Sequence, residues 1–157
     1  MIAGFFRHGP AVPRGTKGVA EAERSLTPEG RKKTLRAARG VRRLDLGFDG
    51  LYSSPLPRAI QTAEILGTVL GLPAPKELEA LRPESTAAAL LKTVRGLRGT
   101  PLLVGHEPLL SQTVGRAAGA SLELKKAGLV VVDLGAGTLL LLLPPSVLRR
   151  LGRSPAS

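Results

Sequence analysis

The sequence predicts an α/β protein: a three-layer sandwich with a mainly parallel central sheet, an antiparallel C-terminal edge hairpin and helices on both faces. Short apolar segments alternate with amphipathic helical segments over most of the 157 residues. Such alternation favours parallel strands joined by right-handed crossovers. The last two β-like segments, 129–134 and 138–143, are separated only by Gly135-Ala136-Gly137, which indicates a hairpin.

The chain begins with a short buried strand within residues 2–9, IAGFFRHG, whose apolar run ends at Arg7, His8 and Gly9. Residues 10–25 are rich in Gly, Pro and charge. We expect them to form a loop, and at 16 residues it is long enough to suggest a functional role.

The first helix is expected to begin at Thr27 and Pro28, since Thr is a good N-cap and Pro suits the first turn. Gly47 is expected to end it. The other expected elements are a strand at 50–53, a helix at 57–70, an irregular segment at 73–83, a helix from Ser85 or Thr86 to about Leu97, a strand at 101–104, a helix from Pro108 to near Gly119 and a closing helix at 144–151.

The length predicts one domain over residues 1–151, followed by a frayed tail at 152–157. The chain has no cysteine, which excludes disulfides and a thiolate nucleophile. The N-terminus lacks the basic region of a signal peptide, and the longest apolar run, 138–145, is far shorter than a membrane span. We therefore expect a cytoplasmic protein without a membrane partner.

A net charge of +11 raises the alternative of a nucleic-acid or polyanion partner. Seven basic residues lie within 31–43, but they alternate with apolar positions, as on the solvated face of a helix. Aromatic residues for stacking on bases make up only 3% of the chain. The pattern favours a solvated basic surface over nucleic-acid binding, and its field would attract an anionic substrate.

The two histidines of the chain, His8 and His106, each follow the carboxyl end of a predicted parallel strand. Arg7 lies at the first of these ends, and Arg58 follows the turn at 53–55. Because the carboxyl ends of parallel strands share one edge of a sheet, we expect these four side chains to converge on one small anion.

This set of residue types suits phosphoryl transfer. The planar fork of arginine gives paired hydrogen bonds to phosphate oxygens. Neutral imidazole is a competent nucleophile near pH 7, so His8 can accept the phosphoryl group if its other ring nitrogen donates to a fixed acceptor such as a backbone carbonyl. His106 is better placed as a second donor to the oxygens. Two structural histidines remain the alternative, whereas a metal site lacks a third His or Cys ligand.

The sequence resembles the histidine phosphatase superfamily, in the branch of the phosphoglycerate mutases and the small SixA-type phosphohistidine phosphatases. The similar segments, in chain order, are Phe6-Arg7-His8-Gly9, Arg24-Ser25-Leu26-Thr27-Pro28-Glu29-Gly30, the run SSPLPRAIQTA at 53–63, Val104-Gly105-His106-Glu107-Pro108, and the ending Leu142-Leu143-Pro144-Pro145 with Leu148. The resemblance implies His8 as phosphoacceptor, a phosphate pocket of Arg7, His8, Arg58 and His106, and no metal or organic cofactor.

Two departures, Pro10 in place of a frequent acidic residue and Ser25 in place of a frequent proline, lie outside the four pocket residues. The chain also has no tryptophan, and so lacks the E-x-x-x-G-x-W-E-G segment that carries the general acid of mutase-like members. Its Leu81-Arg82-Pro83 resembles the SixA-type L-x-P instead.

The missing acid has a chemical meaning. Esters need an acid to protonate the departing alkoxide, whereas the imidazole of phosphohistidine leaves with little help. Glu107 and Glu84 are the candidate general acids or supporting residues, and Glu77 and Glu79 are further alternatives. For each of them, a structural role or a place on the surface is the more favoured interpretation. No long insertion remains to form a lid, so we expect an open, shallow pocket that suits a side chain of another protein.

The sequence therefore predicts an enzyme that hydrolyses phosphohistidine on a partner protein through phospho-His8. Two alternatives remain: a phosphomonoesterase for sugar phosphates or nucleotides, and a non-catalytic module that binds phosphohistidine or polyanions. The residues leave the oligomeric state open.

Overall fold

The strands form one six-stranded sheet in the order β3-β2-β4-β1-β5-β6 in a computed structural model, which describes residues 1–153. The strands are β1 Ile2–Arg7, β2 Gly50–Ser53, β3 Lys76–Glu77, β4 Pro101–Gly105, β5 Leu129–Asp133 and β6 Thr138–Leu143. The pairs β1–β4, β4–β2 and β2–β3 are parallel, and β5 runs antiparallel to both β1 and β6. The predicted mainly parallel sheet with an antiparallel C-terminal hairpin is confirmed.

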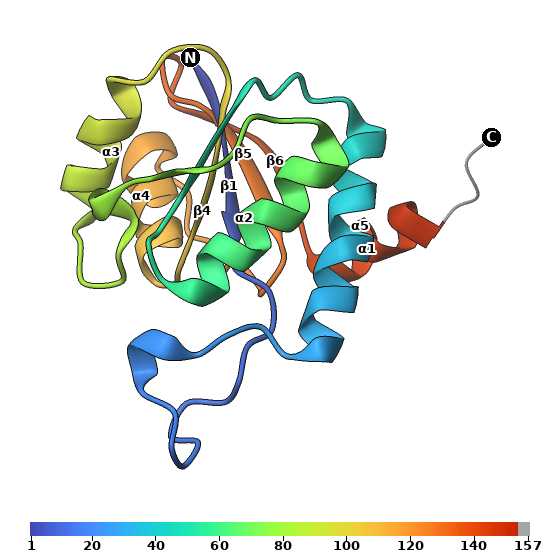
Figure 1. The fold of residues 1–157 in the computed structure, drawn as a ribbon. Coiled ribbons are helices and arrows are strands. Elements are labelled where there is room, and N and C mark those ends of the chain that lie inside the picture. The colour runs from blue at the N-terminus through green and yellow to red at the C-terminus, as the bar shows by residue number, and fades with distance from the viewer. Residues whose placement is uncertain (154–157) are drawn as a thin grey trace.

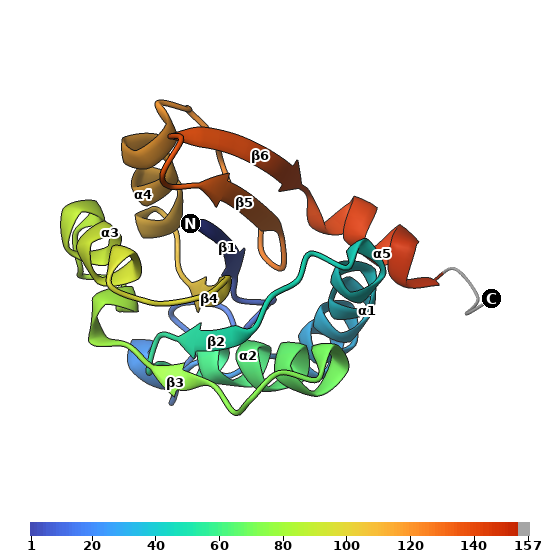
Figure 2. The same ribbon diagram turned by 90° about the horizontal axis from the view of Figure 1, so that it is seen from above.

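Helices cover both faces of the sheet, as predicted: α3 and α4 lie on one face, and α1, α2 and α5 lie on the other (Figure 2). The helices are α1 Pro28–Leu44, α2 Pro57–Leu70, α3 Ala87–Arg95, α4 Leu109–Ala118 and α5 Pro145–Arg153, with short 3-10 turns η1 Glu21–Glu23 and η2 Glu79–Leu81. Among residues 1–153, no helix is long and apolar enough to cross a bilayer.

The alternation of side chains along β1 feeds both layers of the core. Phe5 packs in the cluster beneath α3 and α4, while Phe6 packs in the cluster beneath α1, α2 and α5, and both are fully buried. Because successive strand residues point to opposite faces, a central strand between two helical layers is apolar at every position. β1 is therefore a rigid support for the residues that follow it.

The structure corrects the expected end of the first helix. α1 ends at Leu44 rather than at Gly47, because Asp45 adopts the left-handed conformation (φ 47°) and its N–H bonds to the carbonyl oxygen of Arg42. Aspartate visits this conformation more readily than most non-glycine residues.

The segment at 73–83 is also more regular than predicted, since it contains β3 and η2. β3 exists because Lys76 and Glu77 pair with the edge strand β2, a contact between distant parts of the chain that local composition does not signal.

The closing helix extends beyond its predicted end at Leu151. α5 includes Gly152 and Arg153, two residues assigned to the frayed tail, and the rest of that tail, 154–157, lies outside the described residues. A Cβ at Gly152 would overlap the carbonyl oxygen of Arg36 on α1, and a Cβ at Gly40 would overlap that of Leu148. Glycine on both helices thus permits the close approach that extends α5.

The segment between β1 and α1 leaves the sheet at the carboxyl end of β1 and stands apart from the helical layers (Figure 1). It is pinned at its base, where Ala11 forms an isolated antiparallel bridge with Leu26 and Val12 N–H donates to the carbonyl oxygen of Ser25 at 2.8 Å. Both ends of this loop therefore remain beside the residues that follow β1.

Candidate active site

Three neighbouring strand ends meet at one edge of the sheet and carry the predicted side chains. His8 follows β1, Ser54 follows β2 and His106 follows β4. Backbone hydrogen bonds tie the ends together: His8 N–H donates to the carbonyl oxygen of Gly105 at 3.0 Å, and Ser54 N–H donates to that of Val104 at 2.9 Å. The parallel register thus brings residues that are about fifty or more positions apart into one place.

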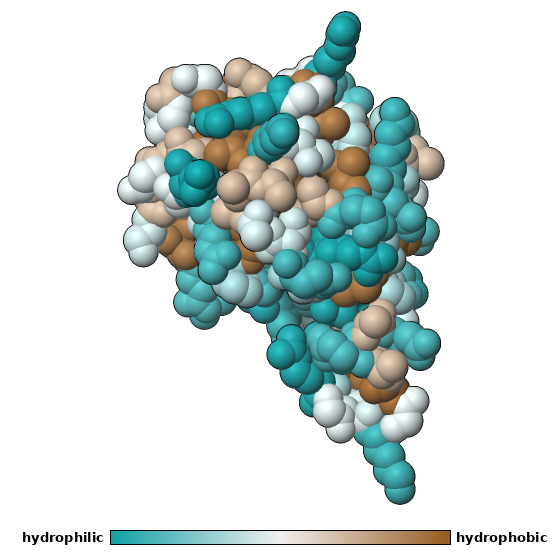
Figure 3. Space-filling model, turned by 90° about the vertical axis from the view of Figure 1, so that its left-hand side faces the viewer, coloured by the Kyte–Doolittle hydropathy of each residue, from teal (hydrophilic) through white to brown (hydrophobic). Residues whose placement is uncertain are grey.

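A cavity of about 870 Å³ lies at this edge, and Arg7, His8, Arg58 and His106 all line it. The structure therefore brings together the four side chains that the sequence singled out. One wall is formed by the 10–25 segment, which stands out below the body of the molecule in the space-filling view (Figure 3). The 10–25 segment, which the sequence suggested to be a functional loop, therefore contributes to the lining of this cavity.

His8 is held by one ring nitrogen and presents the other. The ring is 5% exposed, and its Nδ1 lies 2.7 Å from the carbonyl oxygen of Gly9. A carbonyl oxygen can only accept, so Nδ1 carries the proton and Nε2 carries the lone pair. Gly9 N–H donates in turn to Thr62 Oγ1 at 3.0 Å, which anchors the residue after His8 to α2. The backbone acceptor expected from the sequence is Gly9.

His106 lies opposite His8, with 5.2 Å between the ring centroids. It is almost fully buried, and its Nε2 lies 2.8 Å from the hydroxyl oxygen of Ser54. Its Nδ1 is buried and has no hydrogen-bond partner among residues 1–153. This ring too is anchored through one nitrogen and unsatisfied at the other.

Arg7 and Arg58 also have one side-chain nitrogen bonded to the protein and another without a partner among residues 1–153. Arg7 donates from Nη1 to the carbonyl oxygen of Leu124 at 3.0 Å, and Arg58 donates from Nη1 to that of Glu21 at 3.2 Å. In the described part of the chain, the buried Nε of each arginine has no partner. Because buried polar groups are normally hydrogen-bonded, unpaired donors around one cavity indicate an oxygen-rich anion as the intended ligand.

Both histidines are neutral at pH 7. Burial, with the nearby charges of Arg58 and Arg7, lowers the pKa of His8 to about 3. Burial, with the neighbouring His8 ring and Arg58, lowers the pKa of His106 to about 2. A neutral His8 keeps its Nε2 lone pair available for attack over the physiological range.

Acid is expected to destabilise the folded protein through these two rings. Each folded-state pKa lies below the ordinary value of about 6.5, so between about pH 6.5 and 3 the unfolded chain binds protons that the folded chain does not. Their contribution to stability is fully present above about pH 6.5 and falls on acidification by roughly 1.4 kcal/mol per pH unit for each histidine.

The measurement is the urea unfolding free energy between about pH 7 and 4, compared between the wild type and the variant His106→Gln. Carboxylates contribute equally to both slopes, so the variant should show a slope smaller by roughly 1.4 kcal/mol per pH unit. Equal slopes would show that His106 is not held neutral by the fold.

Sequence reasoning did not single out the charged cluster on the loop. Arg24 is buried and donates from Nε and Nη2 to the two carboxylate oxygens of Glu21, each at 2.9 Å. The same carboxylate lies 3.4 Å from Nη2 of Arg14 and 3.5 Å from Nη2 of Arg58. The Arg24 hydrogen bond, together with the nearby positive charges, lowers the pKa of Glu21, so this carboxylate is a counter-ion and not a proton donor.

Two further basic residues line the cavity, Arg82 and Lys126. Burial, with the nearby charges of Arg7 and Arg24, lowers the pKa of Lys126. The three-residue spacing of Glu21 and Arg24 was a signal for the loop ion pair, whereas nothing in the sequence around Lys126 marks it for this site.

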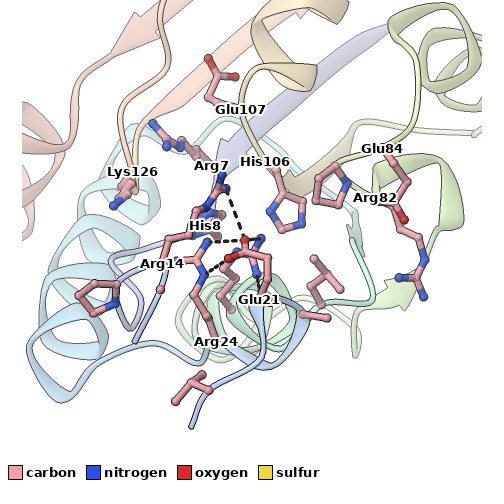
Figure 4. Close-up of a pocket in the computed structure, with 17 residues that line it drawn as sticks. Arg7, His8, Arg14, Glu21, Arg24, Arg82, Glu84, His106, Glu107 and Lys126 are labelled. Carbon is pink, nitrogen blue, oxygen red and sulfur yellow. Dashed lines mark hydrogen bonds and ion pairs between the residues drawn. The ribbon is translucent and has the colours of Figure 1, made fainter. Parts of the chain in front are cut away.

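Two of the four candidate acids, Glu107 and Glu84, line the cavity. One carboxylate oxygen of Glu107 accepts from Ser111 N–H at 2.9 Å, and the other accepts from the Ser111 hydroxyl and from Leu124 N–H. Glu84 is exposed and lies beside Arg82, on the far side of His106 from Lys126 (Figure 4). Glu77 and Glu79 do not line the cavity. Within the described residues, no three His, Asp or Glu side chains gather as metal ligands would.

Comparison with known proteins agrees with this geometry. A sequence model of the histidine phosphatase superfamily (branch 1) matches residues 4–83. The chain is also 36% identical over 140 residues to an uncharacterized protein of Picosynechococcus sp., and the match covers 84% of each chain.

Solved structures share the fold. The structure of the protein histidine phosphatase SixA complexed with tungstate superposes with a TM-score of 0.84 at 22% identity, covering 93% of this chain and 98% of that one. A phosphoserine phosphatase of Entamoeba histolytica in complex with 3-phosphoglyceric acid superposes with a TM-score of 0.69 at 16% identity, covering 94% and 98%. Family and fold together support phosphatase activity. The chain belongs to the histidine phosphatase superfamily (branch 1).

Proposed function

We propose that this protein is a phosphohistidine phosphatase, which removes the phosphoryl group from a histidine of a partner protein through a covalent intermediate on His8. One observation carries the proposal: Arg7, His8, Arg58 and His106 line one cavity, and each has one side-chain nitrogen bonded to the protein and another without a partner among residues 1–153. Donors fixed before substrate arrives need no reorganisation when charge develops during transfer.

The first step forms a bond between His8 Nε2 and phosphorus. The bond between phosphorus and the substrate imidazole breaks, and its electron pair stays on the ring nitrogen. When the other nitrogen of that ring carries a proton, the ring leaves as neutral imidazole and no acid is required. Arg7 and Arg58 line the cavity, and their guanidinium groups can donate to the equatorial oxygens there.

The second step is attack of water on phospho-His8. The bond between Nε2 and phosphorus breaks, the electron pair returns to His8, and the proton of water leaves with the phosphate product. His8 then regains its starting tautomer, since Nδ1 stays bonded to the carbonyl oxygen of Gly9 throughout. The proposed reaction assigns no role to a metal or an organic cofactor.

The pairing of two of the three carboxylates that line the cavity supports a phosphoramidate as the substrate. Glu107 is held by Ser111 and Leu124, Glu21 is held by Arg24, and Glu84 is exposed. The cavity of about 870 Å³ is far larger than a phosphoryl group and leaves room for the ring and stem of an incoming side chain. The structural similarity to the protein histidine phosphatase SixA also supports phosphohistidine as the substrate class. The proposal includes the cytoplasmic location expected from the sequence and a role in signal transduction.

A substrate panel tests this choice. We expect kcat/KM for a phosphohistidine protein to exceed that for sugar-phosphate and nucleotide monoesters by roughly 10²–10⁴-fold, the usual contribution of a general acid. Initial rates of phosphate release with matched concentrations of each substrate give the ratio. A preference for esters would make the protein a phosphomonoesterase, and phosphate binding without release from any substrate would make it a binding module.

Two variants serve as controls for the role of acids. Glu84→Gln and Glu107→Gln each remove a carboxyl group that lines the cavity while keeping its size. Because phosphohistidine needs no acid, its turnover should stay within about twofold of wild type in Glu84→Gln. A loss of roughly 100-fold or more in either variant, without a change in thermal unfolding, would identify the acid that the proposal excludes.

A further inference from the structure

We infer that Ser54 is a positioning residue, whose hydroxyl holds His106 in the Nδ1–H tautomer so that the ring donates to the bound phosphoryl oxygens. The inference rests on the proposed function, because it assigns how one member of the phosphate site works. Ser54 follows β2, outside the set of charged and imidazole side chains that line the cavity.

The contact is buried and short. Ser54 is fully buried and His106 is 2% exposed, and Ser54 Oγ lies 2.8 Å from His106 Nε2. Ser54 Oγ also accepts from Leu56 N–H at 3.3 Å. Its own backbone N–H is fixed to the carbonyl oxygen of Val104 in β4, the strand that ends just before His106. Both members of the pair are therefore mounted on adjacent strands.

The second contact of the Ser54 hydroxyl determines which way the hydrogen bond between Ser54 and His106 runs. Within the described residues, Ser54 Oγ contacts two groups, Leu56 N–H and His106 Nε2. The first is a donor, so the hydroxyl proton of Ser54 finds an acceptor only if Nε2 carries a lone pair. Because the ring is neutral, Nδ1 must then carry the proton. The reverse direction would leave a buried hydroxyl proton without an acceptor, which is unfavourable.

The selected tautomer matches what the cavity needs. Within the described residues, Nδ1 of His106 is buried and has no partner, like the Nε groups of Arg7 and Arg58. An N–H at this position adds a donor to the phosphoryl oxygens, whereas a lone pair would repel them. The two rings are thus set in complementary ways: Gly9 leaves His8 with a lone pair for attack, and Ser54 leaves His106 with a proton to donate.

The adjacent Ser53 provides a matched control. It is also fully buried, and its hydroxyl donates to the carbonyl oxygen of Ser54 at 2.8 Å, away from either histidine ring. Ser54→Ala and Ser53→Ala each delete one buried hydroxyl from the same turn. A general loss of packing would affect both variants, whereas loss of tautomer control would affect Ser54→Ala alone.

The first measurement is the ¹⁵N spectrum of the histidine rings, which contains only His8 and His106 and is assigned with His106→Gln. In the wild type and in Ser53→Ala, His106 should show a protonated Nδ1 and an unprotonated Nε2. In Ser54→Ala, the Nε2–H form should become populated. A wild-type His106 protonated at Nε2 would overturn the inference, even if Ser54→Ala failed to fold.

The second measurement is binding of inorganic phosphate by calorimetry. We expect Ser54→Ala to weaken phosphate binding by about tenfold, Ser54→Cys to be intermediate because a thiol is a weaker donor, and Ser53→Ala to stay within about twofold of wild type. Equal affinities of Ser54→Ala and Ser53→Ala would overturn the inference. Neither measurement uses turnover, so a wild type inactive on phosphohistidine would refute the proposed function while the tautomer of His106 is still read directly.

Discussion

Replacing His8 with asparagine is expected to abolish turnover, with a fall in kcat of at least about 10³-fold. The reason is that the two ring nitrogens have different roles. Nδ1 donates to the carbonyl oxygen of Gly9, and Nε2 carries the lone pair that forms the bond to phosphorus. Asparagine keeps a donor near Gly9 but has no nucleophilic nitrogen at the far end. The same variant should also show no covalent label after incubation with a ³²P-labelled phosphohistidine protein.

The chain offers an internal control for this experiment, because His106 is its other histidine. His106→Gln should still become labelled on His8, more slowly, since it loses a donor to the phosphoryl oxygens and keeps the nucleophile. Label on His106, or residual activity of His8→Asn above about a tenth of wild type, would refute the covalent mechanism. Thermal unfolding of each variant separates loss of chemistry from loss of fold.

Replacing Arg58 should give the second largest effect. We expect Arg58→Ala to lower kcat/KM by about 10²–10³-fold, the usual cost of removing a donor that stabilises developing charge. Arg58 lines the cavity, is 3% exposed and is held through its terminal nitrogens by Glu21, and its buried Nε has no partner among residues 1–153. Arg58→Lys should recover little activity, because lysine keeps the charge but loses the planar fork.

Arg82 is the matched control, since it lines the same cavity with the same chemistry. It is paired with Glu79 and lies to the side of the two histidines (Figure 4). Arg82→Ala should change kcat/KM for a phosphohistidine protein by no more than about threefold, as expected for a half-exposed, paired charge. If Arg58→Ala and Arg82→Ala lost activity to the same extent, the role of Arg58 would be that of general surface charge.

The burial of His8 and His106 affects both the stability of the protein in acid and the activity that the substitutions test. The environment that lowers the pKa of both rings keeps the nucleophile neutral, and it also makes the fold less stable on acidification. Activity assays below about pH 5 would therefore measure unfolding as well as chemistry, and the variants should be compared near pH 7.

Much of the fold could be predicted from sequence because its signals are local. Thr27 and Pro28 begin α1, and Thr86 caps α3, as the residue types indicate. The misassigned segments depended on distant partners: β3 exists through pairing with β2, and α5 continues to Arg153 because glycines on two helices allow close packing. Local composition does not predict such contacts between distant segments.

The candidate site, like the fold, has features that the sequence predicts and features that depend on distant contacts. The sequence by itself determined that Arg7 and the two histidines lie at the carboxyl ends of parallel strands, with Arg58 in the first turn of the helix after a third strand. Strand direction fixes which edge of the sheet such residues reach. Only the tertiary structure decided which atoms are held and which are free. Those choices depend on Gly9, Ser54, Leu124 and the loop residue Glu21, whose contacts arise from backbone geometry and loop folding. The alternation of strands and helices along the chain can be read from local patterns, whereas the direction of a hydrogen bond requires knowing which groups are buried together.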